Sequence, residues 1–210
     1  LVDASNASLL CKLPNEVKVI YKPIAGERPL WDFPDGNLAG REVAAYYLSE
    51  AGKFMVVPKT VLREGPFGIG AVQQWVEVSD DADVIALAQS EDSQIRNLAL
   101  FDIVINNADR KFGHILITPE GRIFGCDHGV SFHEENKLRT VVWQFAEKPL
   151  VSAEVQQLEN LLTNIDRKYL SSMLTDEEIE AIFERTKTLL EVGRFSSPNP
   201  NWPAVPWPPY

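Results

Sequence analysis

Two neighbouring stretches of the chain place polar groups at the ends of apolar runs: INNADRKFGHILI at residues 105–117 and CDHGVSF at residues 126–132. Asp109 follows the first run, His114 comes five residues later, and Asp127 follows the next apolar run. A hydrophobic core needs none of these groups, whereas metal-assisted phosphate chemistry uses carboxylates and imidazoles as ligands. All three histidines of the chain lie in this region, at His114, His128 and His133.

The chain before residue 78 has the pattern of a small β-rich lobe with one helix. Short apolar runs bounded by turn residues predict four strands, at residues 8–13, 16–21, 55–62 and 70–78. Between the second and third strands, apolar positions recur at helical spacing from Leu38. Gly52 is placed to end that helix.

The chain after residue 78 is mainly helical in pattern. Amphipathic helices are predicted at residues 93–107, 151–164 and 175–192. The last one begins with a capping box formed by Thr175 and Glu178, and Gly193 is placed to end it. A small hairpin is expected between the first two helices, from strands at residues 114–118 and 122–126. The predicted class is therefore α+β, with the two lobes of the protein-kinase-like fold.

The expected boundaries follow from this order of elements. Residues 1–78 form the antiparallel β N-terminal lobe, and residues 79–196 form the helical C-terminal lobe with the catalytic loop and the metal-binding hairpin. The tail at residues 197–210 holds six of the fourteen prolines. Trp202 and Trp207 are costly to leave exposed, so we expect the tail to pack on the domain.

The bulk composition excludes several classes of function. A net charge of −10 argues against nucleic-acid binding and against docking on an anionic membrane, because both need a basic face. No apolar run reaches the roughly 20 residues that span a bilayer, and no signal peptide is visible. Cys11 and Cys126 lie in apolar runs and are expected to be reduced thiols. The sequence therefore predicts a cytoplasmic protein without integral membrane association.

The charged residues occur in the order that phosphoryl transfer requires. Lys22 ends a strand and Glu42 lies one turn into the following helix, as in a lysine–glutamate clamp for nucleotide phosphates. Asp109 on a loop, a ligand five residues later, a hairpin and then Asp127-x-Gly match the active site of the kinase fold. Taken singly, each residue could be a surface charge, a turn-capping aspartate or a hydrogen-bonded histidine.

Nearly the whole chain resembles the phosphatidylinositol 3-/4-kinase-like superfamily and, more narrowly, a group of uncharacterised actinobacterial kinase-like proteins. The matching stretches are ASNASLL, VIYKPIAGERPLWDFPDGNLAGREVAAYYLSE, VPKTVLREGPFGIGAVQQWVE, FDIVINNADRKFGHILI, GCDHGVSFHEENKLRTVVW and NWPAVPWPP. The likeness to lipid kinases rests mostly on the Asp-Arg loop and the Asp-x-Gly turn.

This resemblance implies a role for each matching position. Lys22 would bind the ATP phosphates, Glu42 would hold Lys22, Asp109 would be the catalytic-loop aspartate, and Asp127 would be the main metal ligand. Two further groups would contact the nucleotide: a hinge at residues 73–77 that includes Gln74, Trp75 and Val76, and a phosphate loop that includes Ser5, Asn6 and Ser8.

The chain departs from the family pattern at two places. Its phosphate loop is not glycine-rich, so serine hydroxyls and backbone N–H groups would have to serve. His114 replaces the usual metal-binding asparagine, and imidazole suits Mn²⁺ better than Mg²⁺. Alternatively, His114 packs the turn or hydrogen-bonds Asp109.

The remaining polar residues of the region have less specific interpretations. His128 stands where related kinases carry Phe or Asn, and would fix the turn. Lys137 and Arg139 would hold an anionic acceptor or lie as solvated surface charges. Arg110, beside Asp109, would balance local charge.

The leading functional prediction is an ATP-dependent phosphotransferase that uses Mg²⁺ or Mn²⁺ and moves the γ-phosphoryl group to a hydroxyl acceptor. The acceptor would be an inositol-type group, a small polyol or a protein serine or threonine. One alternative is a catalytically weak or inactive nucleotide-binding pseudokinase scaffold. Another is a metal-dependent hydrolase built on His114, Asp127, His128 and His133.

Overall fold

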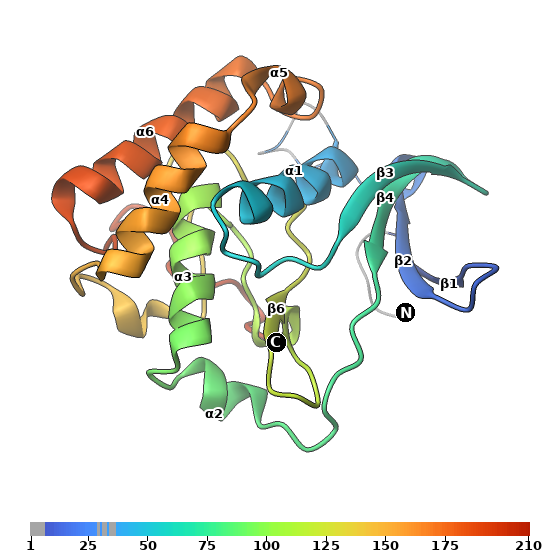
Figure 1. Ribbon diagram of the computed structural model, residues 1–210, viewed down its shortest axis with the longest axis horizontal. Helices are drawn as coiled ribbons and strands as arrows, with labels where there is room; N and C mark the ends of the chain where they lie inside the picture. The colour runs from blue at the N-terminus through green and yellow to red at the C-terminus, as the bar shows by residue number, and fades with distance from the viewer. Residues whose placement is uncertain (1–6, 29, 31–32, 34–36) are drawn as a thin grey trace.

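The computed structural model describes residues 7–28, 30, 33 and 37–210. A four-stranded antiparallel sheet lies on one side of the molecule and most of the helices lie on the other (Figure 1). The strand order is β1-β2-β4-β3, from β1 (Leu9–Lys12), β2 (Lys18–Pro23), β3 (Thr60–Gly65) and β4 (Gly68–Gln74). The predicted α+β class, with a β-rich first lobe and a helical second lobe, is confirmed.

Helix α1 (Leu38–Ala51) lies between the sheet and helix α4 (Ser152–Asn164) (Figure 1). Asn37 caps its first turn, because the side-chain oxygen of Asn37 accepts a hydrogen bond of 2.6 Å from the backbone N–H of Gly40. The helix ends at Gly52, as the sequence predicts.

Arg41 ties helix α1 to the helical lobe. Its side chain is 2% exposed. Its Nη1 donates a hydrogen bond of 2.6 Å to the carbonyl of Ser131, and its Nη2 lies 2.5 Å from Oε1 of Glu178. The helix that carries Glu42 is therefore fixed to the second lobe as well as packed against the sheet.

The helical lobe is built around helix α3 (Ser93–Ile105) and helix α6 (Asp176–Val192), with a two-stranded hairpin between the lobes (Figure 1). The capping box of Thr175 and Glu178 forms as predicted, and Gly193 ends helix α6 with a φ of 67°. Two short helices, α2 and α5, were not predicted, because each is too short to show a helical period. The remaining elements are α2 (Val84–Ala88), α3 (Ser93–Ile105), η2 (Phe112–His114), β5 (Ile115–Ile117), β6 (Ile123–Gly125), η3 (Trp143–Phe145), α4 (Ser152–Asn164), α5 (Arg167–Leu170) and α6 (Asp176–Val192), with η1 (Ile24–Gly26) after β2.

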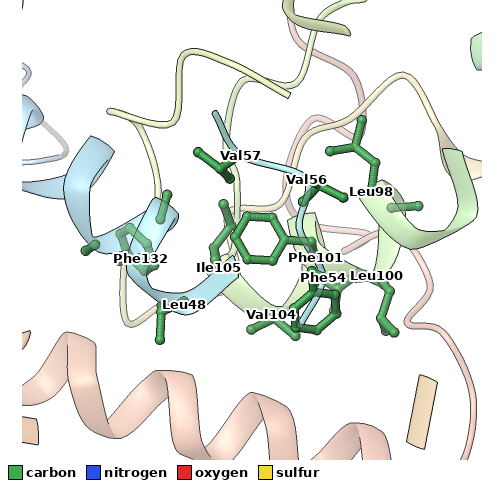
Figure 2. Close-up of a cluster of buried hydrophobic side chains, with 14 of the residues drawn as sticks. Leu48, Phe54, Val56, Val57, Leu98, Leu100, Phe101, Val104, Ile105 and Phe132 are labelled. Carbon is green, nitrogen blue, oxygen red and sulfur yellow. The ribbon is translucent and has the colours of Figure 1, made fainter. Parts of the chain in front are cut away.

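The hydrophobic core joins helix α3 to the segment that follows helix α1 (Figure 2). Phe101 is fully buried, and its ring lies 5.3 Å from that of Phe54. Leu48, Leu98 and Ile105 surround this pair and are also fully buried. Burial of each such side chain contributes about 1.5–3 kcal/mol, so this cluster holds the site-bearing loops on a rigid base.

The boundaries of strands β3 and β4 differ from the prediction. Residues 63–69 were expected to form a long turn, but the strands pair as far as Gly65 opposite Gly68. A two-residue turn suffices because Gly68 has a φ of 90°, which glycine adopts without strain. Residues 55–59, expected to be strand, instead form a loop, in which the backbone N–H groups of Val56 and Val57 bond to the hydroxyl of Ser49.

The proline-rich tail runs along the helical lobe. The carbonyl of Ala204 accepts hydrogen bonds from the backbone N–H of Thr140 and from the indole of Trp143. The carbonyl of Pro209 accepts one from the backbone N–H of Phe112. Trp207 is 89% exposed, so the expectation that its indole is buried is wrong. Across the described ranges, no helix has the length and apolar character to cross a membrane.

Candidate active site

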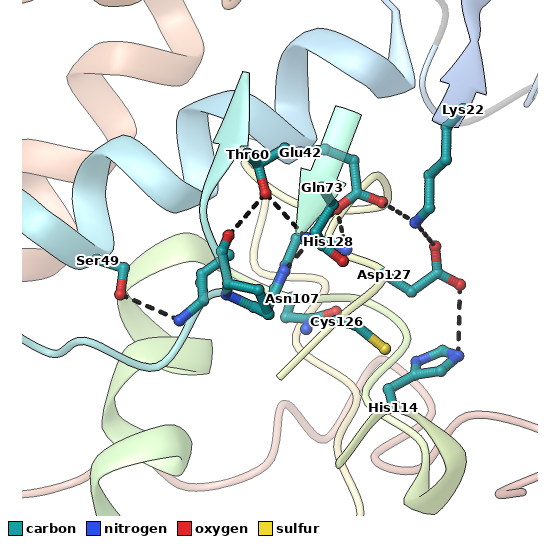
Figure 3. Close-up of polar contacts among 12 residues, drawn as sticks. Lys22, Glu42, Ser49, Thr60, Gln73, Asn107, His114, Cys126, Asp127 and His128 are labelled. Atoms are coloured by element: carbon teal, nitrogen blue, oxygen red, sulfur yellow. Dashed lines mark hydrogen bonds and ion pairs between the residues drawn. The ribbon is translucent and has the colours of Figure 1, made fainter. Parts of the chain in front are cut away.

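Lys22 is the centre of an ion-pair cluster between the two lobes (Figure 3). Its ammonium contacts Oε1 of Glu42 on helix α1 and lies 2.8 Å from Oδ1 of Asp127, which follows strand β6. Burial alone would lower the pKa of Lys22, but the two carboxylates outweigh burial and raise it above its ordinary value. Lys22 in turn holds the pKa of Asp127 well below its usual range, although burial opposes this shift.

His114 lies on the other side of Asp127 (Figure 3). Its Nδ1 is 2.9 Å from the carbonyl of Asp109 and must therefore carry the proton, because a carbonyl can only accept. Burial lowers the pKa of His114, so the ring is neutral near pH 7 and its Nε2 presents a lone pair. That lone pair faces Oδ2 of Asp127 at 3.4 Å. Two acceptors at this distance repel each other unless a cation lies between them.

Asp109 opens onto the same cavity as Lys22, Glu42 and Asp127. The cavity volume is about 110 Å³, which suits phosphate groups better than a whole nucleotide. The side-chain oxygen of Asn107 accepts a hydrogen bond of 3.0 Å from the backbone N–H of Asp109, and this bond fixes the turn. The structure thus brings the three predicted catalytic residues and Asp127 to one cavity.

Of the predicted phosphate-loop residues, Ser8 lines this cavity. Ser5 and Asn6 lie outside the residues that the structure describes.

The predicted hinge residues Gln74, Trp75 and Val76 line a second cavity of about 460 Å³. The backbone N–H of Gln74 donates to Lys59 and that of Trp75 donates to Lys18, so neither N–H is open to a base. Val76 makes no backbone hydrogen bond to any residue within the described ranges. Only Val76, of these three, keeps both of its backbone groups for a ligand.

Arg110 was expected to balance local charge beside Asp109, and the carboxylate that it balances is that of Asp102. Its guanidinium is fully buried and pairs with the fully buried carboxylate of Asp102 on helix α3. His128 is also fully buried, and its Nε2 lies 2.7 Å from Nη2 of Arg110. The sequence signal that could have revealed this pair is a carboxylate, Asp102, inside an otherwise apolar helical run.

Lys137 and Arg139 are not solvated surface charges. The ammonium of Lys137 lies 5.2 Å from the ring centre of Trp202, and the guanidinium of Arg139 lies 5.5 Å from the same ring. Nε of Arg139 also donates a hydrogen bond of 2.6 Å to the carbonyl of Ala108. The tail therefore covers both cations that were candidates for holding an anionic acceptor.

The histidines do not assemble into a metal site of their own. His133 lies edge-on to Phe33 at 5.3 Å, and its Nδ1 accepts a hydrogen bond from the backbone N–H of Glu135. Nε2 of His128 lies 2.7 Å from Nη2 of Arg110, and its Nδ1 lies 4.0 Å from Oε2 of Glu42. Among the residues that the structure describes, no group of three or more His, Cys, Asp or Glu side chains could hold a metal ion. Of the four residues named for the hydrolase alternative, His114 and Asp127 lie together, whereas His128 and His133 contact other groups.

Comparison with known proteins points to a kinase-like relationship. No family model matches the chain. Protein Rv2133c of Mycobacterium tuberculosis is 37% identical over 246 aligned residues, which cover 98% of this chain and 88% of that protein. Phosphatidylinositol 4-kinase gamma 4 of rice (Oryza sativa subsp. japonica) is 27% identical over 129 residues, which cover 52% of this chain and 23% of the rice protein.

A solved structure shows the same fold. The proinflammatory kinase CtkA of Helicobacter pylori superimposes with a TM-score of 0.53, over 92% of this chain and 91% of CtkA. The sequence identity is 12%, so the likeness is one of fold. This comparison therefore shows that the chain has a kinase-like fold.

Proposed function

The chain belongs to the same family as Protein Rv2133c of Mycobacterium tuberculosis, and we propose that it is an ATP-dependent phosphotransferase that moves the γ-phosphoryl group to a hydroxyl. One observation carries this proposal. Lys22 from strand β2, Asp109 from the loop after helix α3 and Asp127 from the loop after strand β6 all line one cavity. A cation and two carboxylates around one small cavity are the groups that phosphoryl transfer uses.

The proposed roles follow from the geometry. The ammonium of Lys22 would neutralise phosphate oxygens, and Glu42, which is 2% exposed, would hold that ammonium in place. Asp109 would accept a hydrogen bond from the acceptor hydroxyl and take its proton as the new bond to phosphorus forms. ATP would supply the phosphoryl group: the bond between its β,γ-bridging oxygen and the γ-phosphorus would break, and ADP would leave.

The residues present fit a divalent cation only together with a nucleotide. Oδ2 of Asp127 and the lone pair of His114 face each other at 3.4 Å, and a cation between them would remove their repulsion. Because two protein ligands are too few to hold Mg²⁺ or Mn²⁺ alone, phosphate oxygens would complete the coordination. The imidazole ligand favours Mn²⁺.

The base of the nucleotide would lie against Val76 in the second cavity, since its backbone groups have no partner within the described residues. For the acceptor, an inositol-type group, a small polyol or a protein serine or threonine all offer the required hydroxyl. The name of the rice phosphatidylinositol 4-kinase is consistent with the first of these.

The test is a calorimetric titration with a non-hydrolysable ATP analogue and Mn²⁺, followed by transfer of labelled γ-phosphate to a panel of acceptors. We expect the wild-type protein to bind and transfer, and Asp127→Asn to lose transfer. Asp80→Asn, which removes an exposed carboxylate elsewhere in the chain, is the matched control. Unchanged transfer by Asp127→Asn, or no binding by the wild-type protein, rejects the proposal.

A second candidate is a nucleotide-binding scaffold without turnover. The ammonium of Lys22 is already paired with Asp127 at 2.8 Å, and this contact competes with a metal ion for the carboxylate. Binding of the analogue without phosphoryl transfer, in either Mg²⁺ or Mn²⁺, would select this function over the first.

A further inference from the structure

The guanidinium of Arg110 lies directly behind the proposed catalytic loop and is fully buried. Its Nε lies 2.9 Å from Oδ2 of Asp102 and its Nη2 lies 2.8 Å from Oδ1, so the two groups form a bidentate pair. Both side chains have 0% exposure. Such a charge-assisted fork has a fixed geometry, and helix α3 therefore sets the orientation of the guanidinium.

The other N–H groups of Arg110 reach the segments that carry the proposed metal ligands. Nη1 donates to the carbonyl of His114 at 3.2 Å and to the carbonyl of Cys126 at 3.0 Å. Nη2 donates to Nε2 of His128 at 2.7 Å. The two flanking residues of Asp127 are thus both bonded to the same guanidinium that bonds the backbone of His114.

All five N–H groups of Arg110 have an acceptor. Two go to Asp102, two to backbone carbonyls and one to His128. Lysine has three donors on a single nitrogen and cannot reproduce this planar pattern.

His128 extends the contact to the first lobe. Because a guanidinium can only donate, Nε2 of His128 accepts and the ring proton sits on Nδ1. The backbone N–H of His128 donates to Oε2 of Glu42 at 3.1 Å, and Oε1 of Glu42 contacts Lys22. A continuous chain of polar contacts therefore runs from Asp102 through Arg110 to the phosphate-binding lysine.

The space around the guanidinium is also filled to its limit. A Cβ atom at Gly125, in strand β6, would lie 2.9 Å from Nη2 of Arg110 and 3.0 Å from Leu98. Any side chain at Gly125 would displace the guanidinium or the strand that leads to Asp127. This close approach shows that strand β6 packs directly against the guanidinium of Arg110, with no room for a side chain between them.

A purely structural ion pair explains less of this pattern. A buried ion pair is a weak source of net stability, because desolvation offsets the attraction between the charges. Three of the five N–H donors of Arg110 bond to His114 and to the two residues that flank Asp127, rather than to Asp102. Partners of this kind orient metal ligands, and their loss typically costs 10- to 100-fold in affinity or activity (an order-of-magnitude range).

We propose that Arg110 is a positioning residue that fixes the spacing of Asp109, His114 and Asp127. The proposal rests on the proposed phosphotransferase function. In the proposed reaction, Arg110 contacts no substrate. Its side chain sets the backbone geometry on which the three residues stand.

The test compares Arg110→Lys, which keeps the charge beside Asp102, with Arg110→Ala. In both variants we expect the Mn²⁺ affinity, measured with the ATP analogue, and kcat to fall by about 10- to 100-fold, while KM for the acceptor changes little. Free guanidinium ion, at concentrations far below those that unfold proteins, should restore part of the loss in Arg110→Ala. Urea at the same concentration should not.

Arg96→Lys is the matched control, because Arg96 forms a similar bidentate pair with Glu154, with bonds of 2.6 and 2.9 Å, away from the cavity. It should leave Mn²⁺ affinity and kcat unchanged.

If the activity is too weak to measure, amide hydrogen exchange tests the positioning role without any ligand. Amide hydrogen exchange in Arg110→Lys should speed up at residues 109–114 and 126–128, and not at the segment around Glu154. Exchange and Mn²⁺ affinity equal to those of the wild-type protein would reject the positioning role while leaving the phosphotransferase proposal intact. A wild-type protein that binds no nucleotide would reject both.

Discussion

The carboxylate of Asp127 lies 2.8 Å from the ammonium of Lys22, although 105 positions separate the two residues in the chain. Strand β2 supplies the lysine and the loop after strand β6 supplies the aspartate. The two residues come from different lobes, so the contact depends on how the lobes pack against each other.

Replacement of Lys22 by methionine removes the cation from the cavity. We expect phosphoryl transfer to fall by about 100- to 1000-fold, the size of effect seen when one electrostatic partner of a transition state is lost. The measurement is transfer of labelled phosphate, with Lys168→Met, at an exposed lysine of helix α5 away from both cavities, as the control. Equal activity of Lys22→Met and the wild-type protein would contradict the assigned role.

Replacement of His114 by asparagine restores an amide oxygen where the imidazole stands. We expect the ratio of Mn²⁺-supported to Mg²⁺-supported activity to fall by about tenfold or more, because oxygen ligands suit Mg²⁺ better than nitrogen does. Activity at saturating concentrations of each metal gives the ratio. A ratio that does not move would mean that His114 binds no metal and only fixes the turn.

Cys126 should react slowly with thiol reagents. Burial, followed by the nearby charge of Asp127, raises the pKa of this thiol from 9.0 to about 12. A raised thiol pKa keeps the sulfur protonated and unreactive, so the alkylation rate should climb steadily between pH 8 and the region of that pKa. The measurement uses Cys11→Ser, which leaves one cysteine. Full modification with a midpoint near the ordinary thiol value would show that the site is open to solvent.

Truncation of Phe101 should destabilise the whole protein. This fully buried ring packs 5.3 Å from Phe54 and 6.1 Å from His128. Phe101→Ala should lower the free energy of unfolding by about 3–5 kcal/mol, measured by urea denaturation. Phe67→Ala, at a ring that is 60% exposed, should change it by no more than about 0.5 kcal/mol. Similar losses for both variants would place Phe101 outside the core.

Trp202 should contribute to the stability of the folded protein, whereas Trp207 should not. The indole of Trp202 makes cation–π contacts with Lys137 and Arg139, whereas Trp207 is 89% exposed. Trp202→Ala should cost about 1–2 kcal/mol from two cation–π contacts, and Trp207→Ala should cost almost nothing. Thermal unfolding of the two variants makes the comparison. A larger loss for Trp207→Ala would mean that the tail lies differently on the domain.

Local patterns predicted the elements whose ends are marked by specific residues. Helix α6 begins at a capping box and ends at Gly193, and helix α1 ends at Gly52, because these caps satisfy backbone groups without help from the rest of the fold. The same reasoning failed at residues 63–69. A glycine-rich stretch resembles a loop, but two glycines that flank a tight turn let the paired strands continue to its edge.

The site was predictable where the order of residues along the chain carries the information. Lys22, Glu42 and Asp127 were expected together, and the structure brings them together. The support behind them was not predictable, because a fully buried arginine reads in sequence like any surface cation. Which N–H groups of the hinge are already bonded also depends on strand register, and sequence patterns do not fix that register.

The anchoring of Arg41 has a mechanical consequence. Helix α1 carries Glu42 but is bonded to Ser131 and Glu178 of the helical lobe. If the lobes part to admit a nucleotide, the glutamate travels with the helices and Lys22 travels with the sheet. The distance between the Lys22 ammonium and the Glu42 carboxylate would then increase as the lobes open. This distance therefore reports the degree of lobe closure.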